Sequence, residues 1–375
     1  MPESDTFEFY ASASPGTEKA LCDELRELSF QSVRLNRSGI PFRGPRSEGW
    51  RACLESRIAQ RIFLVISRFQ ASDQDELYKG VQSIDWSPYI TNDHTLSISA
   101  FCAASNINHS GFAALKTKDA IIDQLRGTGT ARPDIDKDDP DVRIFVYILK
   151  DKATVYLDLS GNALHRRGYR PESGEAPLRE TLAAAILRMS GWDRKTPLVD
   201  PMCGSGTIAI EAAQWARNIA PGLSRSQFGF ERWADFTDED SQELRQLIGS
   251  LRSQASGTAP KIKASDIDSS VLETAASNAR SAGVRLSFKE RSLFDIQGDG
   301  RPGFIVTNPP YGVRLEADTD FCRKAASAFT RLHGWTVAIL AGDPDLERAI
   351  STKPKTKLPL KNGDLDCHLL VYEID

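Results

Sequence analysis

Four consecutive residues, Asn308-Pro309-Pro310-Tyr311, combine the groups that a site for a planar amine needs. They follow an apolar run, 303–306, that is typical of a buried parallel strand. Open α/β sheets bind their ligands at the carboxyl ends of such strands. The amide of Asn308 and the carbonyl of Pro309 can accept two hydrogen bonds from an exocyclic amine, and Tyr311 offers a ring for stacking. Asn-Pro is also an ordinary turn former, so the upstream residues must decide between a site and a turn.

A glycine-containing turn upstream predicts a second part of the same site. A strand is expected to end at Asp200 and a helix to begin after Thr207, with Gly204 and Gly206 between them. The glycines permit a close approach of the backbone to a ligand, and the free N–H groups of the helix suit a carboxylate. The turn lacks the third glycine of a dinucleotide fingerprint and the Gly-Lys-Ser/Thr of a phosphate loop. The alternative is a plain strand-to-helix turn of a doubly wound fold.

An acidic residue at the end of a further expected strand completes the set. Asp266 comes directly off the strand 263–266, after the glycine turn and before Asn308. In dinucleotide-binding folds, an acid at this place accepts hydrogen bonds from ribose hydroxyls. Asp268 could instead cap the helix that begins near Ser269. A lone acid at a strand end is usually a cap or solvated, but the order of the three motifs favours a ligand role for Asp266.

Together these residues resemble the motifs of the class I S-adenosylmethionine (SAM)-dependent methyltransferases that methylate amines. The resemblance implies an α/β, Rossmann-like domain with SAM as its cofactor. It implies catalytic roles for Asn308, Pro309, Pro310 and Tyr311, and cofactor contacts from Asp200, Pro201, Cys203, Gly204, Ser205, Gly206, Thr207, Asp266, Ile267, Ser292 and Asn308. Ser292 departs from the family pattern, which usually has an acid there to meet the adenine amine, and Asp295 follows it.

The rest of the chain resembles one branch of that class. The segment 112–123 is similar to the signature helix of a THUMP domain, an RNA-binding module. Three more segments, 164–170, 176–185 and 358–367, resemble the THUMP-containing 23S ribosomal RNA guanine-N2 methyltransferases and their transfer-RNA-modifying relatives. Some members carry an older label as DNA adenine methylases. The resemblance implies RNA, specifically 23S rRNA, as the partner and substrate.

Other functions stay open on the residues alone. The same N2-guanine methylation of tRNA, N6-adenine methylation of nucleic acid and glutamine methylation of a protein all fit residues 308–311. The THUMP-like segment disfavours DNA and protein. Covalent cytosine-C5 chemistry through Cys203 or Cys322 is disfavoured, because Cys203 lies inside the cofactor turn. A non-catalytic RNA-binding factor with a relict pocket is the alternative outside enzymes, and failure to bind SAM would favour it.

The expected organisation is an α+β THUMP RNA-binding region before the Rossmann-like domain. We expect a ferredoxin-like segment (1–55), a THUMP domain (56–162), a linker (163–177) and the methyltransferase domain (178–375). RNA contacts are expected from Lys116, Lys118, Arg166, Arg167 and Arg170. Between residues 31 and 70, eight arginines face only two acids, which also suggests phosphate contacts, although such arginines can simply solvate a helix.

Strands alternate with helices in the second half, which predicts a parallel sheet with a closing antiparallel hairpin. Strands are expected at 7–12, 59–67, 95–100, 143–150, 154–159, 198–200, 263–266, 285–290, 304–307, 336–341, 356–359 and 367–373. Helices are expected at 17–28, 111–125, 178–189, 207–217, 238–250, 270–282 and 319–332.

Composition sets the outer limits. At 375 residues with 40% apolar content, two or three globular domains are expected. No apolar run approaches the roughly 20 residues that span a bilayer, and the N-terminus predicts no signal peptide. Six scattered cysteines without a CxxC pair argue against a metal site and for a reduced, cytoplasmic protein. A net charge of −4 argues mildly against indiscriminate nucleic-acid binding. The chain ends soon after the expected hairpin, so no second methyltransferase domain is expected behind it.

Overall fold

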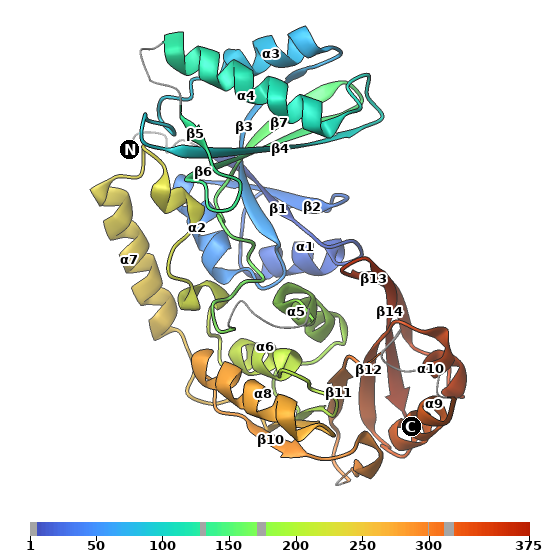
Figure 1. Ribbon diagram of the computed structural model, residues 1–375. Helices are drawn as coiled ribbons and strands as arrows, with labels where there is room; N and C mark the ends of the chain where they lie inside the picture. The colour runs from blue at the N-terminus through green and yellow to red at the C-terminus, as the bar shows by residue number, and fades with distance from the viewer. Residues whose placement is uncertain (1–5, 128–132, 171–177, 299, 311–318) are drawn as a thin grey trace.

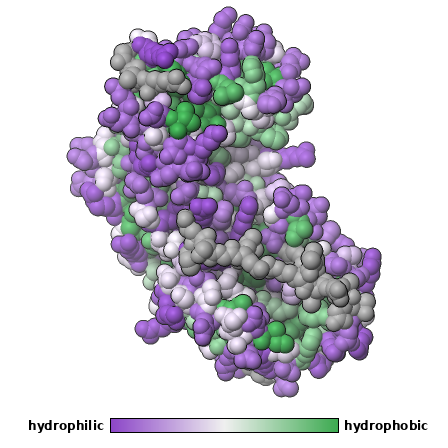
Figure 2. Space-filling model, viewed as in Figure 1, coloured by the Kyte–Doolittle hydropathy of each residue, from purple (hydrophilic) through white to green (hydrophobic). Residues whose placement is uncertain are grey.

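The computed structural model describes residues 6–127, 133–170, 178–298, 300–310 and 319–375. It consists of two lobes, each built on a seven-stranded sheet (Figure 1). Hydrophilic residues cover most of the face seen in Figure 2. Within the described ranges, no helix combines the length and the apolar character that a membrane span requires.

The sheet of the N-terminal lobe has the order β2-β1-β3-β7-β6-β4-β5. Its strands are β1 (Phe7–Ser12), β2 (Gly39–Gly44), β3 (Arg61–Gln70), β4 (Thr95–Ala103), β5 (Asp134–Ile135), β6 (Val142–Leu149) and β7 (Lys152–Asp158). Because β3 pairs with both β1 and β7, one sheet runs through the ferredoxin-like segment and the THUMP-like region. The boundary expected at residue 55 therefore stays a prediction.

Four helices pack on one face of this sheet: α1 (Glu18–Glu27), α2 (Arg46–Glu55), α3 (Gln74–Gln82) and α4 (Ser110–Gly127). Strand β6 shows why the two faces differ, since its residues alternate between buried and partly exposed. Ile144, Val146 and Ile148 join the core with the helices, whereas Phe145 and Tyr147 lie on the opposite face. In Figure 1, α3 and α4 lie side by side above β4.

The sheet of the C-terminal lobe has the order β10-β9-β8-β11-β12-β14-β13. Its strands are β8 (Leu198–Asp200), β9 (Ile262–Asp266), β10 (Ser287–Glu290), β11 (Phe304–Thr307), β12 (Trp335–Ala341), β13 (Thr356–Asn362) and β14 (Leu365–Ile374). The first five are parallel, and β14 runs antiparallel to both β12 and β13. The predicted parallel sheet and closing hairpin are thus confirmed. The chain order reverses between β8 and β11, which is where open α/β sheets bind ligands.

Helices surround this second sheet (Figure 1). They are α5 (Glu180–Met189), α6 (Thr207–Ala216), α8 (Ser269–Ser281), α9 (Thr319–Thr330) and α10 (Pro344–Ala349), with the short 3-10 turn η3 (Leu293–Asp295). Between α6 and β9 the chain forms α7 (Asp238–Ser253) and the 3-10 turns η1 (Pro221–Ser224) and η2 (Gly229–Arg232). The helices expected from the sequence did not include α2, α3 or α10. These helices have 10, 9 and 6 residues, which is shorter than the window of about 11–18 residues in which a helical periodicity is read.

The segment between α6 and β9 packs against the N-terminal lobe. Trp50 of α2 stacks on Phe230 of η2, with ring centroids 5.5 Å apart. Gly222 of η1 lies so close to α2 that an added Cβ would stand 2.7 Å from the Cα of Leu54. Leu251 of α7 belongs to the same hydrophobic core. The region expected to be the methyltransferase domain therefore supplies part of the core of the other lobe.

Candidate active site

Three strands of the C-terminal sheet end side by side, and each carries a residue expected in the site. Asp200 ends β8, Asp266 ends β9 and Asn308 follows β11. Strand β8 pairs with both β9 and β11, so these ends are neighbours at one edge of the sheet. The structure thus brings together the three motifs that the sequence placed far apart.

The glycine turn has the backbone conformation that glycine allows. Gly204 has φ +49° and Gly206 has φ +86°, both in the left-handed region, and α6 begins at the next residue. A Cβ on Gly206 would stand 3.2 Å from Ala275 of α8, whereas one on Gly204 would meet nothing within 4 Å. The side-chain amide of Asn278 on α8 donates to the carbonyl of Ser205 at 3.0 Å. Helix α8 therefore packs against one side of the turn, whereas the space next to Gly204 is open.

Asp200 lies beneath the turn and is buried. Its Oδ1 accepts a hydrogen bond from Thr307 Oγ1 at 3.0 Å and one from the Met202 N–H at 3.4 Å. Burial raises the pKa of Asp200 to about 7, although both hydrogen bonds favour the ionised form. Burial also raises the pKa of the Cys203 thiol, which argues against a nucleophilic thiolate in this turn.

Asp266 connects β9 to the glycine turn. Its Oδ2 accepts from the Gly204 N–H at 2.9 Å, and its Oδ1 accepts from the Asp268 N–H at 3.1 Å. Asp268 caps α8 by accepting from the Ser270 N–H at 2.9 Å, so the capping role considered from the sequence is confirmed. Between them, Ile267 is 73% exposed.

Asn308 places a hydrogen-bond acceptor at the carboxyl end of β11. Its Oδ1 is buried and has no hydrogen-bond partner among the described residues. A buried acceptor without a partner costs roughly 1–3 kcal/mol, so a ligand that brought a donor to this atom would be stabilised. Pro309 is buried and Pro310 is exposed. Tyr311, expected to stack on a base, lies outside the described residues.

Ser292 follows β10 but uses its hydroxyl locally. Its Oγ accepts from the Phe294 N–H at 3.2 Å and so caps η3. Asp295, the nearby acid, is exposed. The contact of Ser292 with the adenine amine therefore stays a prediction.

Two of the five residues expected to contact RNA are used inside the fold instead. Arg167 is 2% exposed, lies 3.4 Å from the buried carboxylate of Glu211 on α6, and donates to the carbonyl of Leu164 at 2.8 Å. Arg170 is half-buried, pairs with Glu180 at 3.4 Å and donates to the Thr207 hydroxyl. The expectation that Arg167 contacts RNA was wrong. Its guanidinium is buried and is compensated by a buried carboxylate, so it is not accessible to a phosphate.

The other three stay predictions. Arg166 is exposed, beside the buried Arg167. Lys116 lies over the ring of Tyr78, 4.9 Å from the ring centre, and Lys118 lies 3.3 Å from the carboxylate of Asp119.

The arginine-rich stretch between residues 31 and 70 also differs from expectation. Most of its arginines pair with carboxylates. Some of these carboxylates lie outside residues 31–70 and so were not counted with the stretch, and the others lie in the same helix as the arginine. Arg43 and Arg68 meet Glu8, Arg46 meets Asp235, Arg61 meets Asp158, and Arg51 meets Glu48 and Glu55. Arg57 is buried and donates to the carbonyl of Ile219 at 2.6 Å. Arg34 and Arg37 are exposed on a loop, and the exposed Arg43 and Arg68 share Glu8, so the stretch is not a continuous basic surface.

Sequence reasoning missed two residues that hold the site together, Thr307 and Asn278. A signal existed for Thr307, since it is the polar residue that closes an apolar strand directly before Asn308. Asn278 gave none, because a single polar residue on a helix usually faces solvent, whereas this one is buried against the glycine turn. Among the described residues, no cluster of three His, Cys, Asp or Glu side chains could hold a metal ion.

Sheet order, glycine turn and strand-end residues define a class I methyltransferase fold. The chain belongs to the RMKL-like methyltransferase domain family, whose model matches residues 167–371. Residues 71–158 match the THUMP domain, and residues 8–63 match the RlmL ferredoxin-like domain. Fold class and family resemblance are both confirmed.

Individual proteins agree with this assignment. The ribosomal RNA large subunit methyltransferase K/L of Syntrophotalea carbinolica is 40% identical over 98% of this chain, which covers 53% of that protein. The chain thus spans about half the length of the curated relatives it matches.

Two solved structures match nearly end to end. SMU.472, assigned as a methyltransferase and crystallised with S-adenosylhomocysteine (SAH), is 31% identical with a TM-score of 0.86, covering 99% of this chain and 98% of its own. A protein of Listeria monocytogenes, named as a predicted N6-adenine-specific DNA methylase, is 30% identical with a TM-score of 0.86, covering 98% and 96%.

Proposed function

We propose that the protein transfers a methyl group from SAM to the exocyclic N2 amine of a guanine in 23S rRNA. The observation that carries the proposal is the buried Oδ1 of Asn308 at the carboxyl end of β11, which meets no hydrogen-bond donor among the described residues. An amine could donate one hydrogen bond to this oxygen, and the Pro309 carbonyl beside it can accept a bond from the second amine hydrogen. Beside Asn308 lies the glycine turn, so amine and cofactor would meet at the same edge of the sheet.

The residues around the glycine turn fit SAM. The open front of Gly204, the first turn of α6 and the carboxylate of Asp266 offer space, N–H donors and an acceptor. The exposed Ile267 beside Asp266 offers an apolar surface for the adenine ring. The residues proposed to hold SAM are Asp200, Pro201, Cys203, Gly204, Ser205, Gly206, Thr207, Asp266, Ile267, Ser292 and Asn308. When bound, SAM supplies an electrophilic methyl group on a sulfonium.

The protein's part in the reaction is to orient a weak nucleophile. The lone pair of the guanine amine is delocalised into the ring, and hydrogen bonds to Asn308 and Pro309 would turn it toward the methyl group. Orientation of this kind can supply on the order of 7–11 kcal/mol. Tyr311 would stack on a base turned out of its helix. The amine proton becomes acidic once the nitrogen is alkylated, so no strong general base is required.

The choice of RNA as substrate rests on the THUMP match and on the names of the curated relatives. The choice of guanine rests on the family resemblance alone. The name given to the Listeria protein favours N6-adenine methylation as the second candidate, since Asn308 and Pro309 would accept an adenine amine equally well.

A methyl-transfer assay tests the proposal. The protein is incubated with radiolabelled SAM and unmodified 23S, 16S and transfer RNA, and the labelled nucleosides are identified. N2-methylguanosine in 23S RNA alone is the expected product. The Asn308→Ala variant should lose methyl transfer while still binding SAH by calorimetry. Label in transfer RNA, or N6-methyladenosine in any fraction, would overturn the assigned substrate; a fully active Asn308→Ala would overturn the assigned site.

A further inference from the structure

The sheet of the N-terminal lobe has a second face, opposite helices α1–α4. Alternation along the strands places Arg143, Phe145 and Tyr147 of β6 on that face. The register of β4 against β6 sets Ser99 beside Phe145 and Phe101 beside Tyr147. We call the surface formed by Phe63, Ser99, Phe101, Arg143, Phe145 and Tyr147 the open sheet face.

Aromatic rings cover this face. Phe101 and Tyr147 are parallel within 6°, with their centroids 5.6 Å apart. Phe63 and Phe145 stack at 5.7 Å. Phe101 is 50% exposed, although a phenyl ring normally lies in a core. Flat rings presented side by side on a sheet suit the flat faces of unpaired bases.

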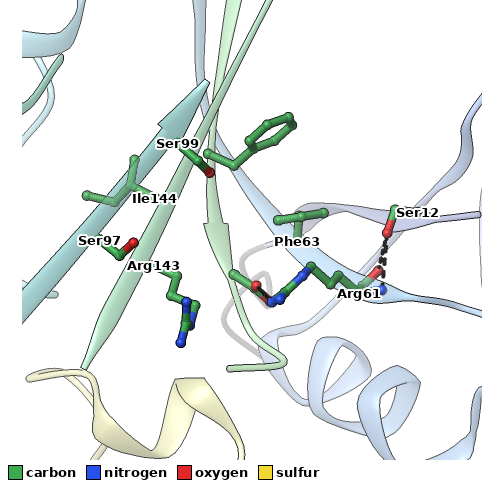
Figure 3. A pocket seen from close by; sticks show the side chains of 9 residues that line it. Ser12, Arg61, Phe63, Ser97, Ser99, Arg143 and Ile144 are labelled. Atoms are coloured by element: carbon green, nitrogen blue, oxygen red, sulfur yellow. Dashed lines mark hydrogen bonds and ion pairs between the residues drawn. The ribbon is translucent and has the colours of Figure 1, made fainter. Parts of the chain in front are cut away.

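A pocket lies on the same face, between β1, β3, β4, β6 and β7 (Figure 3). Its volume of about 340 Å³ is at the lower end of the range of roughly 300–1,000 Å³ usual for small-molecule sites. Phe63 and Phe145 line it together with the hydroxyls of Ser97 and Ser99, which can both donate and accept hydrogen bonds. In Figure 3, Ser97 and Arg143 lie side by side.

The charge of the pocket is positive. Two guanidinium groups, Arg61 and Arg143, line it together with one carboxylate, Asp158. Arg61 forms an ion pair with the buried Asp158. Arg143 donates to the backbone carbonyl of Asp138 at 2.5 Å, and in the described part of the chain it forms no ion pair. One cation is therefore available for an anion beside the aromatic rings.

We propose that the open sheet face binds unpaired RNA, with one base stacked on Phe101, the next inserted into the pocket against Phe145, and a phosphate on Arg143. The inference rests on the proposed function and adds to it the surface that holds the substrate. Stacking is tolerant of sequence, and the serine hydroxyls would read the edge of the inserted base. Duplex RNA is excluded, because its bases are already stacked on one another.

Fluorescence anisotropy with a short fluorescein-labelled oligouridine and the full chain tests this. Phe101→Ala should raise Kd about tenfold, a change of about 1.4 kcal/mol. Arg143→Gln should also raise Kd, and should reduce the slope of log K against log salt by about 0.7, the value for one phosphate contact on a single strand. Arg245→Gln is the matched control, because it removes the same charge from an exposed arginine on α7, outside the open sheet face.

Three results would overturn the inference: tighter binding of the duplex than of the single strand, equal affinity of Phe101→Ala and wild type, or a loss in Arg245→Gln as large as in Arg143→Gln. Methyl transfer to RNA separates this failure from that of the proposed function. If the enzyme is active but its RNA affinity is unchanged in Phe101→Ala and Arg143→Gln, only the proposed role of the open sheet face is refuted. If the enzyme is inactive but its RNA affinity falls in these two variants, only the proposed reaction is refuted.

Discussion

The hydroxyl of Thr307 donates a 3.0 Å hydrogen bond to the carboxylate of Asp200, and both groups are buried beneath the candidate active site. The bond joins the ends of β11 and β8, the two strands between which the chain order reverses. Asn308 is the next residue after Thr307, and the glycine turn is the next segment after Asp200. One polar pair therefore fixes the proposed catalytic motif relative to the proposed cofactor turn.

Removing the hydroxyl should weaken that connection. Thr307→Val keeps the shape of the side chain but leaves the Asp200 carboxylate without its side-chain donor. A hydrogen bond to a charged group contributes roughly 1.5–3 kcal/mol, so we expect a loss of that size in urea unfolding at pH 8. Thr307→Ser retains the hydroxyl and should stay within about 1 kcal/mol of wild type. Equal stability of Thr307→Val and wild type would show that the bond contributes nothing.

The pH dependence of stability should report Asp200. Its pKa is about 7 in the folded protein and about 3.9 in an unfolded chain. The folded state then holds a proton that the unfolded state releases, so stability falls as pH rises from about 4 to about 7 and is level above. A pKa difference of this size corresponds to roughly 4 kcal/mol at most. Asp200→Asn cannot titrate, so the unfolding free energy of the wild type minus that of the variant should increase by about 2–3 kcal/mol from pH 8 to pH 5; a constant difference would contradict the raised pKa.

Alanine substitutions at two glycines distinguish the cost of backbone strain from the cost of steric crowding. Gly206 and Gly283 have φ +86° and +70°, so alanine at either place costs about 1–2 kcal/mol for the left-handed conformation. Only at Gly206 would the new Cβ also press on Ala275 and Phe288, both 3.2 Å away. We expect Gly206→Ala to lose more stability in thermal unfolding and to bind SAH at least tenfold more weakly. Gly283→Ala, with open space around it, should bind SAH normally.

Adjacent arginines of the linker should behave in opposite ways. Arg167→Ala leaves the fully buried Glu211 without its guanidinium, which should cost about 3–5 kcal/mol in chemical denaturation. Arg166 is exposed, and Arg166→Ala should cost less than about 1 kcal/mol. A small loss in Arg167→Ala would contradict the assignment of a stabilising buried ion pair between Arg167 and Glu211.

Local patterns predicted the elements and the motif order well. Strands β1, β8 and β11 begin and end at the predicted residues, because short apolar or alternating runs bounded by turn formers define a strand locally. Asp200, Asp266 and Asn308 were each placed at a strand end from the sequence, and the structure puts them there. Pairing between distant segments was beyond reach: nothing in residues 1–70 indicates that β3 joins two regions into one sheet, or that Trp50 stacks on Phe230.

The sequence by itself determined the class of fold, the order of the three motifs and the residues from which a methyl-transfer site could be built. Tertiary structure alone decided which charges are free. Arg46 forms an ion pair with Asp235, and Arg167 forms one with Glu211, in each case with a residue distant in the sequence. The guanidinium of Arg143 forms no ion pair within the described residues. The reason is physical: a backbone pattern is set by neighbours in the chain, but a charge is neutralised by whatever carboxylate folding brings within about 4 Å of it.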